Sequence, residues 1–267
     1  MPILRAAGTD YRIDGILFDK DGTLLDFIYT WGNWSERLLA RFSAFLQERK
    51  LPPPDVDLDA LWGALRADDG TVSDYDRNGP LAMGTVDEIL TILAWQGYRS
   101  GLSWAEAKTL AADAKRWADA SLEASRSARL LPHVLPFLEE CRRSGLPLAV
   151  VTADDTLPAV KHLEWLGIRE FFSAVIGTDQ VKRGKPYPDM ALLACDRLGL
   201  DGGKFAVIGD TEGDIRMAKE AGAAAAIRIA AIGDRGSAAG GFSPASEADA
   251  IVSSLRELSI IQEEGPT

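Results

Sequence analysis

The chain has 267 residues, of which 46% are hydrophobic and 26% are charged, a composition typical of a soluble globular protein with one large or two small domains. Its 29 basic and 40 acidic residues give a formal net charge of −11, which argues against nonspecific binding to nucleic acid or to an anionic membrane. The two cysteines are too few for a disulfide framework, and neither a signal peptide nor a membrane span is evident, so we expect a cytoplasmic protein.

Short apolar segments recur along the chain and predict a parallel sheet that is covered on both faces. Apolar residues occupy successive positions in these segments, as expected for strands that have no solvent-facing side. Segments with helical patterns lie between them and end near Gly145, Gly199 and Gly222. This alternation predicts a doubly wound α/β fold with a Rossmann-type core. The expected strands are Ile13 to Phe18, Leu148 to Val151, Ala174 to Ile176, Phe205 to Ile208 and Ala224 to Ile227.

Residues 29–129 interrupt the alternation and predict a separate helical domain. Large apolar residues at helical spacing begin at Trp31, and residues 84–98 and 103–125 have the pattern of amphipathic helices. Six of the seven tryptophans fall in this region, which indicates a core of its own. We therefore predict an α/β core from residues 1–28 and 130–267, with an all-helical domain, residues 29–129, inserted into it. The stretch from Gly233 to Ser246 is expected to be a loop.

Carboxylates follow two of the expected strands at the point where each strand ends. Asp19 and Asp21 follow the first strand, and Asp210 and Asp214 follow the strand that begins at Phe205. Because strand ends in an open α/β sheet meet at one edge, we expect these acids to crowd together and to need a cation. Oxygen ligands without a histidine cluster favour Mg²⁺.

Two more segments add groups that suit a phosphate. Thr152 follows a strand and provides a hydroxyl in a turn of backbone N–H groups, and Lys185 stands between Gly184 and Pro186. A lysine there can balance the acids and neutralise a phosphoryl group. In an extended backbone Asp19 and Asp21 point the same way, so Lys20 is expected to point elsewhere.

With these four segments in order, the chain resembles the haloacid dehalogenase superfamily, in its phosphoglycolate phosphatase-like branch with a helical cap. The matching motifs are DKDGTLLD, VVTAD, GKPYPD and GDTEGD, and residues 29–129 fall where the cap of that family falls. The resemblance implies a phosphatase that uses Mg²⁺ and acts on a small phosphorylated metabolite. It also covers essentially the whole chain.

The resemblance implies a role for each matching residue. Asp19 would be the nucleophile that becomes an aspartyl phosphate, and Asp21 the acid and base for the leaving alcohol and the attacking water. Thr152 would hold phosphate oxygens, and Lys185 would stabilise Asp19 and the phosphoryl group. Asp210 would bind Mg²⁺ together with the Asp19 carboxylate and the Asp21 backbone carbonyl. Metal contact would keep Asp19 ionised, whereas nearby anions would favour a protonated Asp21.

For most of the remaining residues, both a functional role and an ordinary structural role are possible. Asp214 would support the metal or the lysine, or would be an acid that favours a helix start. Gly22, Thr23 and Ala153 would contact the substrate. Arg77, in a polar loop of the inserted domain, would clamp a second anionic group of the substrate, or would be a solvated loop arginine. Thr152, Asp154 and Asp155 are also candidates for helix N-caps, and His133 and His162 for structural residues.

Three alternatives to a phosphatase stay open at this point. A sugar-phosphate mutase similar to β-phosphoglucomutase also has the second acid of the first motif. A signalling receiver also combines acids, a threonine and a lysine at strand ends, although it needs neither the inserted domain nor Asp21. A catalytically silent regulatory protein on the same fold is the third. The substrate and the oligomeric state, monomer or homodimer, do not follow from the sequence.

Overall fold

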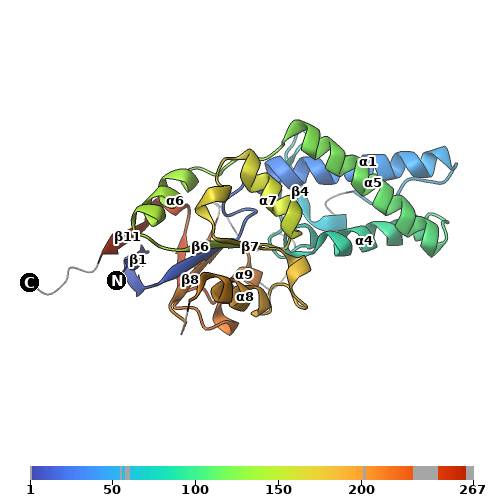
Figure 1. Cartoon of the computed structure of the whole chain (residues 1–267). Coiled ribbons are helices and arrows are strands. Elements are labelled where there is room, and N and C mark those ends of the chain that lie inside the picture. The colour runs from blue at the N-terminus through green and yellow to red at the C-terminus, as the bar shows by residue number, and fades with distance from the viewer. Residues whose placement is uncertain (1, 55, 58–60, 201–202, 231–245, 263–267) are drawn as a thin grey trace, which may run out of the picture. The chain divides into compact units, whose positions relative to one another are not determined.

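Six strands form a central sheet in the computed structural model of the chain (Figure 1). Their order is β10-β9-β8-β3-β6-β7 and every neighbouring pair is parallel, which confirms the predicted doubly wound α/β sheet. The structure describes residues 2–54, 56–57, 61–200, 203–230 and 246–262. The strands are β3 Gly15–Phe18, β6 Leu148–Val151, β7 Ala174–Ile176, β8 Phe205–Gly209, β9 Ala225–Ile229 and β10 Ala250–Val252.

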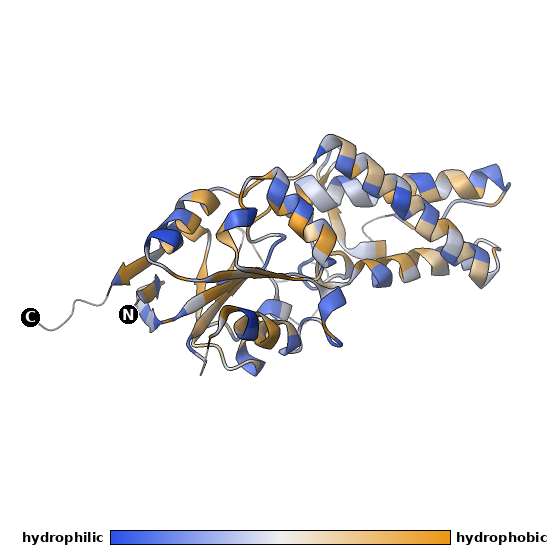
Figure 2. Ribbon diagram, viewed as in Figure 1, coloured by the Kyte–Doolittle hydropathy of each residue, from blue (hydrophilic) through white to orange (hydrophobic). Residues whose placement is uncertain are grey.

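The middle of this sheet is buried on both faces. Every residue of β3, β6, β7 and β8 is buried, which explains why these strands are uninterrupted apolar runs (Figure 2). β3 lies between β8 and β6, and Phe18 pairs with Ile208 on one side and with Val150 on the other. The carboxyl ends of these three strands therefore lie level at one edge of the sheet.

Four helices cover the sheet, with α8 and α9 on one side and α6 and α7 on the other (Figure 1). On the first side, Met190 of α8 and Ile215 of α9 pack into a buried cluster with Leu17. On the second side, the rings of Phe137 and Phe172 pack edge-to-face against Phe18, each at a centroid distance of 6.1 Å. The helices are α6 Val134–Arg143, α7 Thr156–Trp165, α8 Asp189–Leu198 and α9 Glu212–Glu220, and the single-turn helices are η2 Arg169–Phe171, η3 Thr178–Gln180 and η4 Leu255–Glu257.

A small antiparallel sheet joins the two ends of the chain and was not predicted. β1 Pro2–Ala6 pairs with both β2 Thr9–Arg12 and β11 Leu258–Gln262. β2 is mostly exposed and carries polar residues, so it lacks the apolar run that marks the strands of the central sheet. The predicted loop from Gly233 to Ser246 lies, except for its last residue, outside the described residues.

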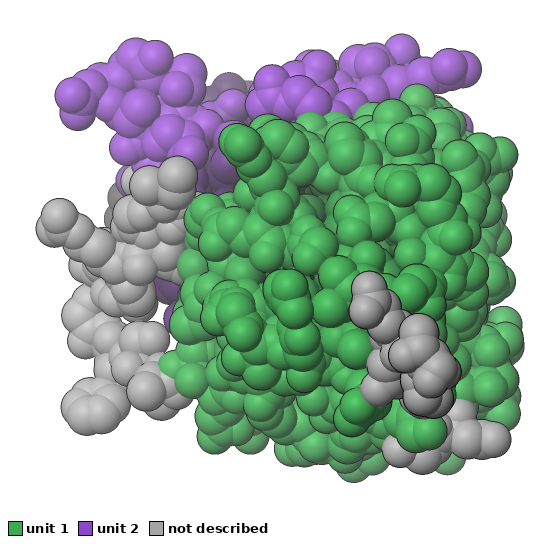
Figure 3. Space-filling view, turned by 90° about the vertical axis from the view of Figure 1, so that its left-hand side faces the viewer, with its two compact units in different colours: residues 1–26, 130–267 green, residues 27–129 purple. Residues whose placement is uncertain are grey.

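The chain divides into two compact units (Figure 3). We call Met1–Asp26 together with Leu130–Thr267 the α/β unit, and Phe27–Arg129 the inserted unit. The two boundaries lie within two residues of the positions expected from the sequence. In the part of the chain that the structure describes, we find no helix with both the length and the apolar character that a membrane span requires.

The inserted unit is built mainly from helices that pack on one another. α5 contacts both α1 and α4, and α4 and α5 each begin with a capping box, at Thr85 with Glu88 and at Ser103 with Glu106. Its described elements are η1 Ile28–Gly32, α1 Asn33–Glu48, β4 Ala64–Arg66, β5 Val72–Tyr75, α3 Pro80–Met83, α4 Val86–Arg99 and α5 Trp104–Ser125.

The prediction that this unit is all-helical is wrong, because it contains a two-stranded antiparallel hairpin, β4-β5. The strands have three and four residues, and the register shifts between Leu65 and Arg66, so an alternating pattern had no length in which to appear. Tyr75 at the end of β5 is buried and stacks on Phe27 at a centroid distance of 3.9 Å. That contact anchors the hairpin to the start of the unit.

Candidate active site

The ends of three neighbouring strands bring the predicted residues to one edge of the central sheet. Asp19 directly follows β3, Asp210 directly follows β8, and Thr152 directly follows β6. The backbone N–H of Asp19 donates to Ile208 O at 2.8 Å, so the strand pairing extends to this residue. Position at the end of a buried strand thus places each side chain.

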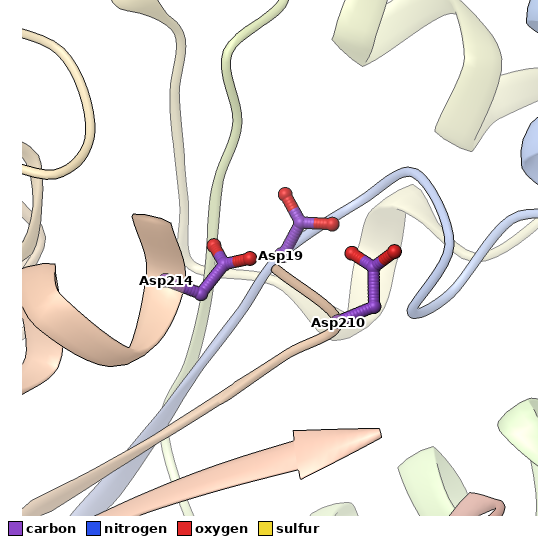
Figure 4. Close-up of side chains that lie close together, drawn as sticks. All are labelled: Asp19, Asp210 and Asp214. Carbon is purple, nitrogen blue, oxygen red and sulfur yellow. The ribbon is translucent and has the colours of Figure 1, made fainter. Parts of the chain in front are cut away.

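Three of these carboxylates lie close together, as Figure 4 shows for Asp19, Asp210 and Asp214. One oxygen from each lies within 4.8 Å of the others, and the residues are 5%, 3% and 0% exposed. Three buried acids at this separation repel one another, and each loses hydration. The arrangement is stable only if positive charge compensates it.

Asp214 combines the two roles that the sequence left open. It is the third residue of α9, where its Oδ2 accepts hydrogen bonds from the backbone N–H of Thr211 at 3.1 Å and from the Thr211 hydroxyl at 2.6 Å. Its Oδ1 lies 2.6 Å from Lys185 Nζ. A Cβ on Gly209 would come within 2.4 Å of the Asp214 side chain, so this approach requires the glycine in GDTEGD.

Lys185 supplies part of the positive charge. Its Nζ donates to Asp19 Oδ1 at 2.5 Å as well as contacting Asp214, and its side chain is 7% exposed. Burial alone lowers the pKa of Lys185, but the two carboxylates raise it above the ordinary value. The lysine is therefore held as a cation between two acids.

One lysine does not compensate the whole cluster. Burial raises the pKa of Asp19 well above its ordinary value; Lys185 lowers it, while Asp214, Asp210 and Asp21 raise it further. The Oδ2 atom of Asp19 is buried and has no hydrogen-bond partner among the described residues. Unused carboxylate oxygens in an all-oxygen donor set fit a hard divalent cation such as Mg²⁺, which would also keep Asp19 ionised.

The loop after Asp19 is closed by its own backbone hydrogen bonds. Gly22 has a φ of 86° and its N–H donates to Leu25 O at 2.8 Å, so a residue with a side chain would be strained there. Thr23 is 1% exposed, and its hydroxyl has no hydrogen-bond partner among the described residues. Both predicted substrate contacts therefore lie in a rigid turn, and their part in binding stays a prediction.

The turn after β6 has the features expected of an anion site. Thr152 is 1% exposed, and its Oγ1 accepts a hydrogen bond from the Asp154 N–H at 3.2 Å, which leaves the hydroxyl proton to donate elsewhere. Ala153 is half-buried beside it. The N-cap of α7 is Asp155, but its side chain makes no capping hydrogen bond, so neither Thr152 nor Asp154 caps this helix.

Lys20 does not point away from the acids, contrary to the expectation from strand alternation. It is 0% exposed, and its Nζ lies 2.7 Å from Asp21 Oδ2, 3.1 Å from Asp154 Oδ2 and 3.1 Å from His162 Nδ1. The strand pairing ends with the N–H of Asp19, so the alternation no longer applies at Lys20. Sequence reasoning missed this cluster of Lys20, Asp154 and His162. A charge directly after a buried strand, which requires a partner, is the signal that could have indicated it.

Burial and nearby charges shift the pKa values of Asp154 and His162 in this cluster. Burial raises the pKa of Asp154 to about 6 although Lys20 opposes the change, and burial together with Lys20 lowers the pKa of His162 to about 2. His162 is therefore neutral, so its 3.7 Å approach to Asp154 is not an ion pair, and its Nδ1 accepts from Lys20. Asp21 is not among the carboxylates grouped with Asp210.

Arg77 belongs to the inserted unit and is held there by its neighbours. Its Nη1 donates to Asp74 Oδ1 at 2.7 Å and to Tyr75 O at 2.9 Å, and its guanidinium lies 4.3 Å from the centre of the Tyr75 ring. These contacts order the side chain. A contact of Arg77 with substrate stays a prediction.

Comparisons with known proteins identify a family that matches most of the chain. The family model described as haloacid dehalogenase-like hydrolase matches residues 13–222. Phosphoglycolate phosphatase of Escherichia coli (strain K12) is 42% identical over 93 residues, which are 35% of this chain and 37% of that enzyme. The match thus spans little more than a third of the curated relative.

Solved structures share the fold. A protein described as a predicted phosphoglycolate phosphatase from Haemophilus somnus 129pt has a TM-score of 0.60 at 23% identity, with 90% of this chain and 93% of that chain covered. β-Phosphoglucomutase from Clostridium difficile also has a TM-score of 0.60, at 16% identity, with 92% of each chain covered. At these identities the likeness concerns architecture, and phosphatases and mutases share it.

Proposed function

The chain belongs to the haloacid dehalogenase-like hydrolase family, and from this premise we propose that it is a Mg²⁺-dependent phosphatase acting on a small phosphorylated metabolite. The observation that carries the proposal is the meeting of Asp19, Asp210, Asp214 and Lys185 at one sheet edge. A nucleophilic carboxylate, acids for a divalent cation and a buried lysine are the parts that phosphoryl transfer requires.

In the first step the Asp19 carboxylate attacks the phosphorus of a phosphate monoester. A bond forms between the carboxylate oxygen and phosphorus while the ester P–O bond breaks, and the leaving alcohol takes a proton from Asp21. Lys185 lies against Asp19 and offsets the negative charge of the phosphoryl group. The hydroxyl of Thr152 donates a hydrogen bond to a phosphoryl oxygen.

In the second step water regenerates the carboxylate. Asp21, now ionised, takes a proton from the water, whose oxygen attacks phosphorus, and the bond between phosphorus and Asp19 breaks. The products are inorganic phosphate, the free Asp19 carboxylate and protonated Asp21. Each proton that Asp21 gives up in the first step is thus recovered in the second.

Three carboxyl groups of this chain would hold the cation, namely those of Asp19 and Asp210 and, directly or through water, that of Asp214. When bound, Mg²⁺ supplies charge neutralisation at the phosphate and keeps the nucleophile ionised. The Asp21 backbone carbonyl is a further candidate ligand.

We also propose how the substrate is recognised and where the protein acts. The similarity to phosphoglycolate phosphatase favours a small anionic phosphate ester, and Arg77 would recognise a second anionic group on it. Gly22, Thr23 and Ala153 would line the phosphate position. Both cysteines are free and buried, which supports a location in the reducing cytoplasm. We propose a monomer or a homodimer as the oligomeric state.

A phosphate-release screen over small phosphometabolites, with Mg²⁺ and with EDTA, tests the proposal. We expect release that depends on Mg²⁺ and is lost in Asp19→Asn, because an amide cannot act as the nucleophile. Absence of release from every ester, or equal release by Asp19→Asn, would refute it. Following a hexose 1-phosphate by NMR in parallel identifies a mutase, which isomerises the sugar instead of releasing phosphate.

A further inference from the structure

We propose that Lys20 is a positioning residue that fixes the carboxylate of Asp21, and that Asp154 and His162 hold Lys20 in place. The inference rests on the proposed function, because it concerns the acid and base of that reaction. It assigns a task to a fully buried charge that lies beside, but not among, the residues that would touch phosphate or metal.

Three groups surround the ammonium group of Lys20. Its Nζ lies 2.7 Å from Asp21 Oδ2, 3.1 Å from Asp154 Oδ2 and 3.1 Å from the acceptor Nδ1 of His162. An ammonium group can donate to three acceptors, and here two carboxylate oxygens lie at ion-pair distance while the His162 nitrogen accepts a hydrogen bond. These partners therefore determine the direction of the Lys20 side chain. Lys20 in turn holds the carboxylate of Asp21 in one orientation.

The consequence for Asp21 is that its two oxygens differ. Oδ2 is engaged by Lys20, whereas Oδ1 is buried and has no hydrogen-bond partner among the described residues. A group that must give a proton to an alcohol and later take one from water needs one oxygen held ready at a fixed place. The Lys20 contact selects Oδ1 as that oxygen.

The supports of Lys20 come from the phosphate side of the site. Asp154 stands two residues after Thr152, and its N–H donates to the Thr152 hydroxyl oxygen at 3.2 Å. His162 lies on α7, the helix that follows the same turn. Lys20 therefore ties the loop after β3 to the turn after β6, so the position of the acid is set relative to the anion site.

A purely structural ion pair would explain the contacts equally well, and the dependence of the reaction on leaving group separates the two. If Asp21 is misplaced, hydrolysis slows for esters whose poor leaving group needs a proton. Hydrolysis of 2,4-dinitrophenyl phosphate does not slow, because its leaving group needs no proton from the enzyme. Loss of folded protein lowers the rate with both esters by the same factor.

The experiment compares kcat/KM for an alkyl phosphate found in the screen and for 2,4-dinitrophenyl phosphate. The variants are Lys20→Met and the double variant Lys20→Met/Asp154→Leu, which removes Asp154 together with Lys20 so that Asp154 is not left buried without its counter-ion. Lys219→Met is the matched control, since Lys219 forms an ion pair with Asp249 on the same unit. Crystal structures of wild type and double variant report the orientation of Asp21.

We expect the alkyl phosphate rate to fall roughly 10- to 100-fold and the dinitrophenyl rate to change less than about threefold, with Asp21 reoriented in the crystal. Equal losses for both esters, or an unchanged Asp21, would overturn the inference. If the wild type hydrolyses neither ester, the proposed function fails, and the orientation of Asp21 in the two crystals still decides whether Lys20 positions it.

Discussion

Lys185 Nζ lies 2.5 Å from Asp19 Oδ1, although 166 residues separate the two along the chain. The same ammonium group reaches Asp214 at 2.6 Å, so a single lysine bridges the loop after β3 and the first turn of α9, the helix that follows β8. Neither contact is local, and both depend on the parallel sheet that brings those strands side by side. The candidate site is thus a product of the fold and not of one motif.

Replacing Lys185 by Met should destabilise the protein. The change leaves Asp19 and Asp214 buried without their counter-ion, and breaking a buried pair in this way costs about 3–5 kcal/mol. Urea denaturation in the absence of Mg²⁺ measures the loss. Lys219→Met removes a partly exposed pair with Asp249 and should change the free energy of unfolding by less than about 1 kcal/mol. Similar small changes in both variants would show that Lys185 does not compensate the acids.

If Asp19, Asp210 and Asp214 hold Mg²⁺ as proposed, the cation should stabilise the folded wild-type protein, because only the folded chain gathers these carboxylates. At a concentration 100-fold above its Kd, the cation adds about 2.7 kcal/mol, which is roughly 5–10 °C in Tm for a protein of this size. Differential scanning fluorimetry with and without Mg²⁺ measures the shift. Asp210→Asn should abolish it, whereas Asp196→Asn, on the exposed side of α8, should keep it. A full shift in Asp210→Asn would place the cation elsewhere.

His162 should make the protein less stable in acid. Its pKa is about 2 in the folded protein and near 6.5 when unfolded, so below pH 6.5 the unfolded chain binds a proton that the folded chain does not. The stability contribution is present above pH 6.5 and falls by about 1.4 kcal/mol for each pH unit below it. In His162→Asn the pH dependence contributed by His162 should disappear. The difference in unfolding free energy between the variant and wild type should therefore change between pH 6.5 and 5, and stay constant between pH 7.5 and 8.5. A difference that is constant throughout would mean that His162 titrates normally.

The positions of Asp19, Thr152 and Asp210 could be predicted because each directly follows an uninterrupted apolar strand. Strand ends in a doubly wound sheet converge, so sequence position alone places these side chains at one edge. Asp214 was harder, since an acid in the first turn of a helix is expected for its own reasons. In the fold, one of its oxygens completes the capping box while the other lies against Lys185, a pairing that no local pattern indicates.

Other parts could not be read from one sequence, because they depend on partners far along the chain. Lys20 was expected to point away, yet Asp154 and His162 come together around it from α7 and the turn before that helix. The hairpin β4-β5 escaped prediction because its strands are short and interrupted by a register shift. Tertiary contacts, and not local periodicity, define both features.

The most direct test of the account is a rapid-quench experiment with a ³²P-labelled substrate in the presence of Mg²⁺, followed by mapping of any protein-bound label. We expect acid-stable label to appear on the peptide that contains Asp19 and to decay as phosphate is released. Asp19→Asn should acquire none. Label on another residue, or turnover by the wild type with no protein-bound phosphate at any time, would contradict the assignment of Asp19 as the nucleophile.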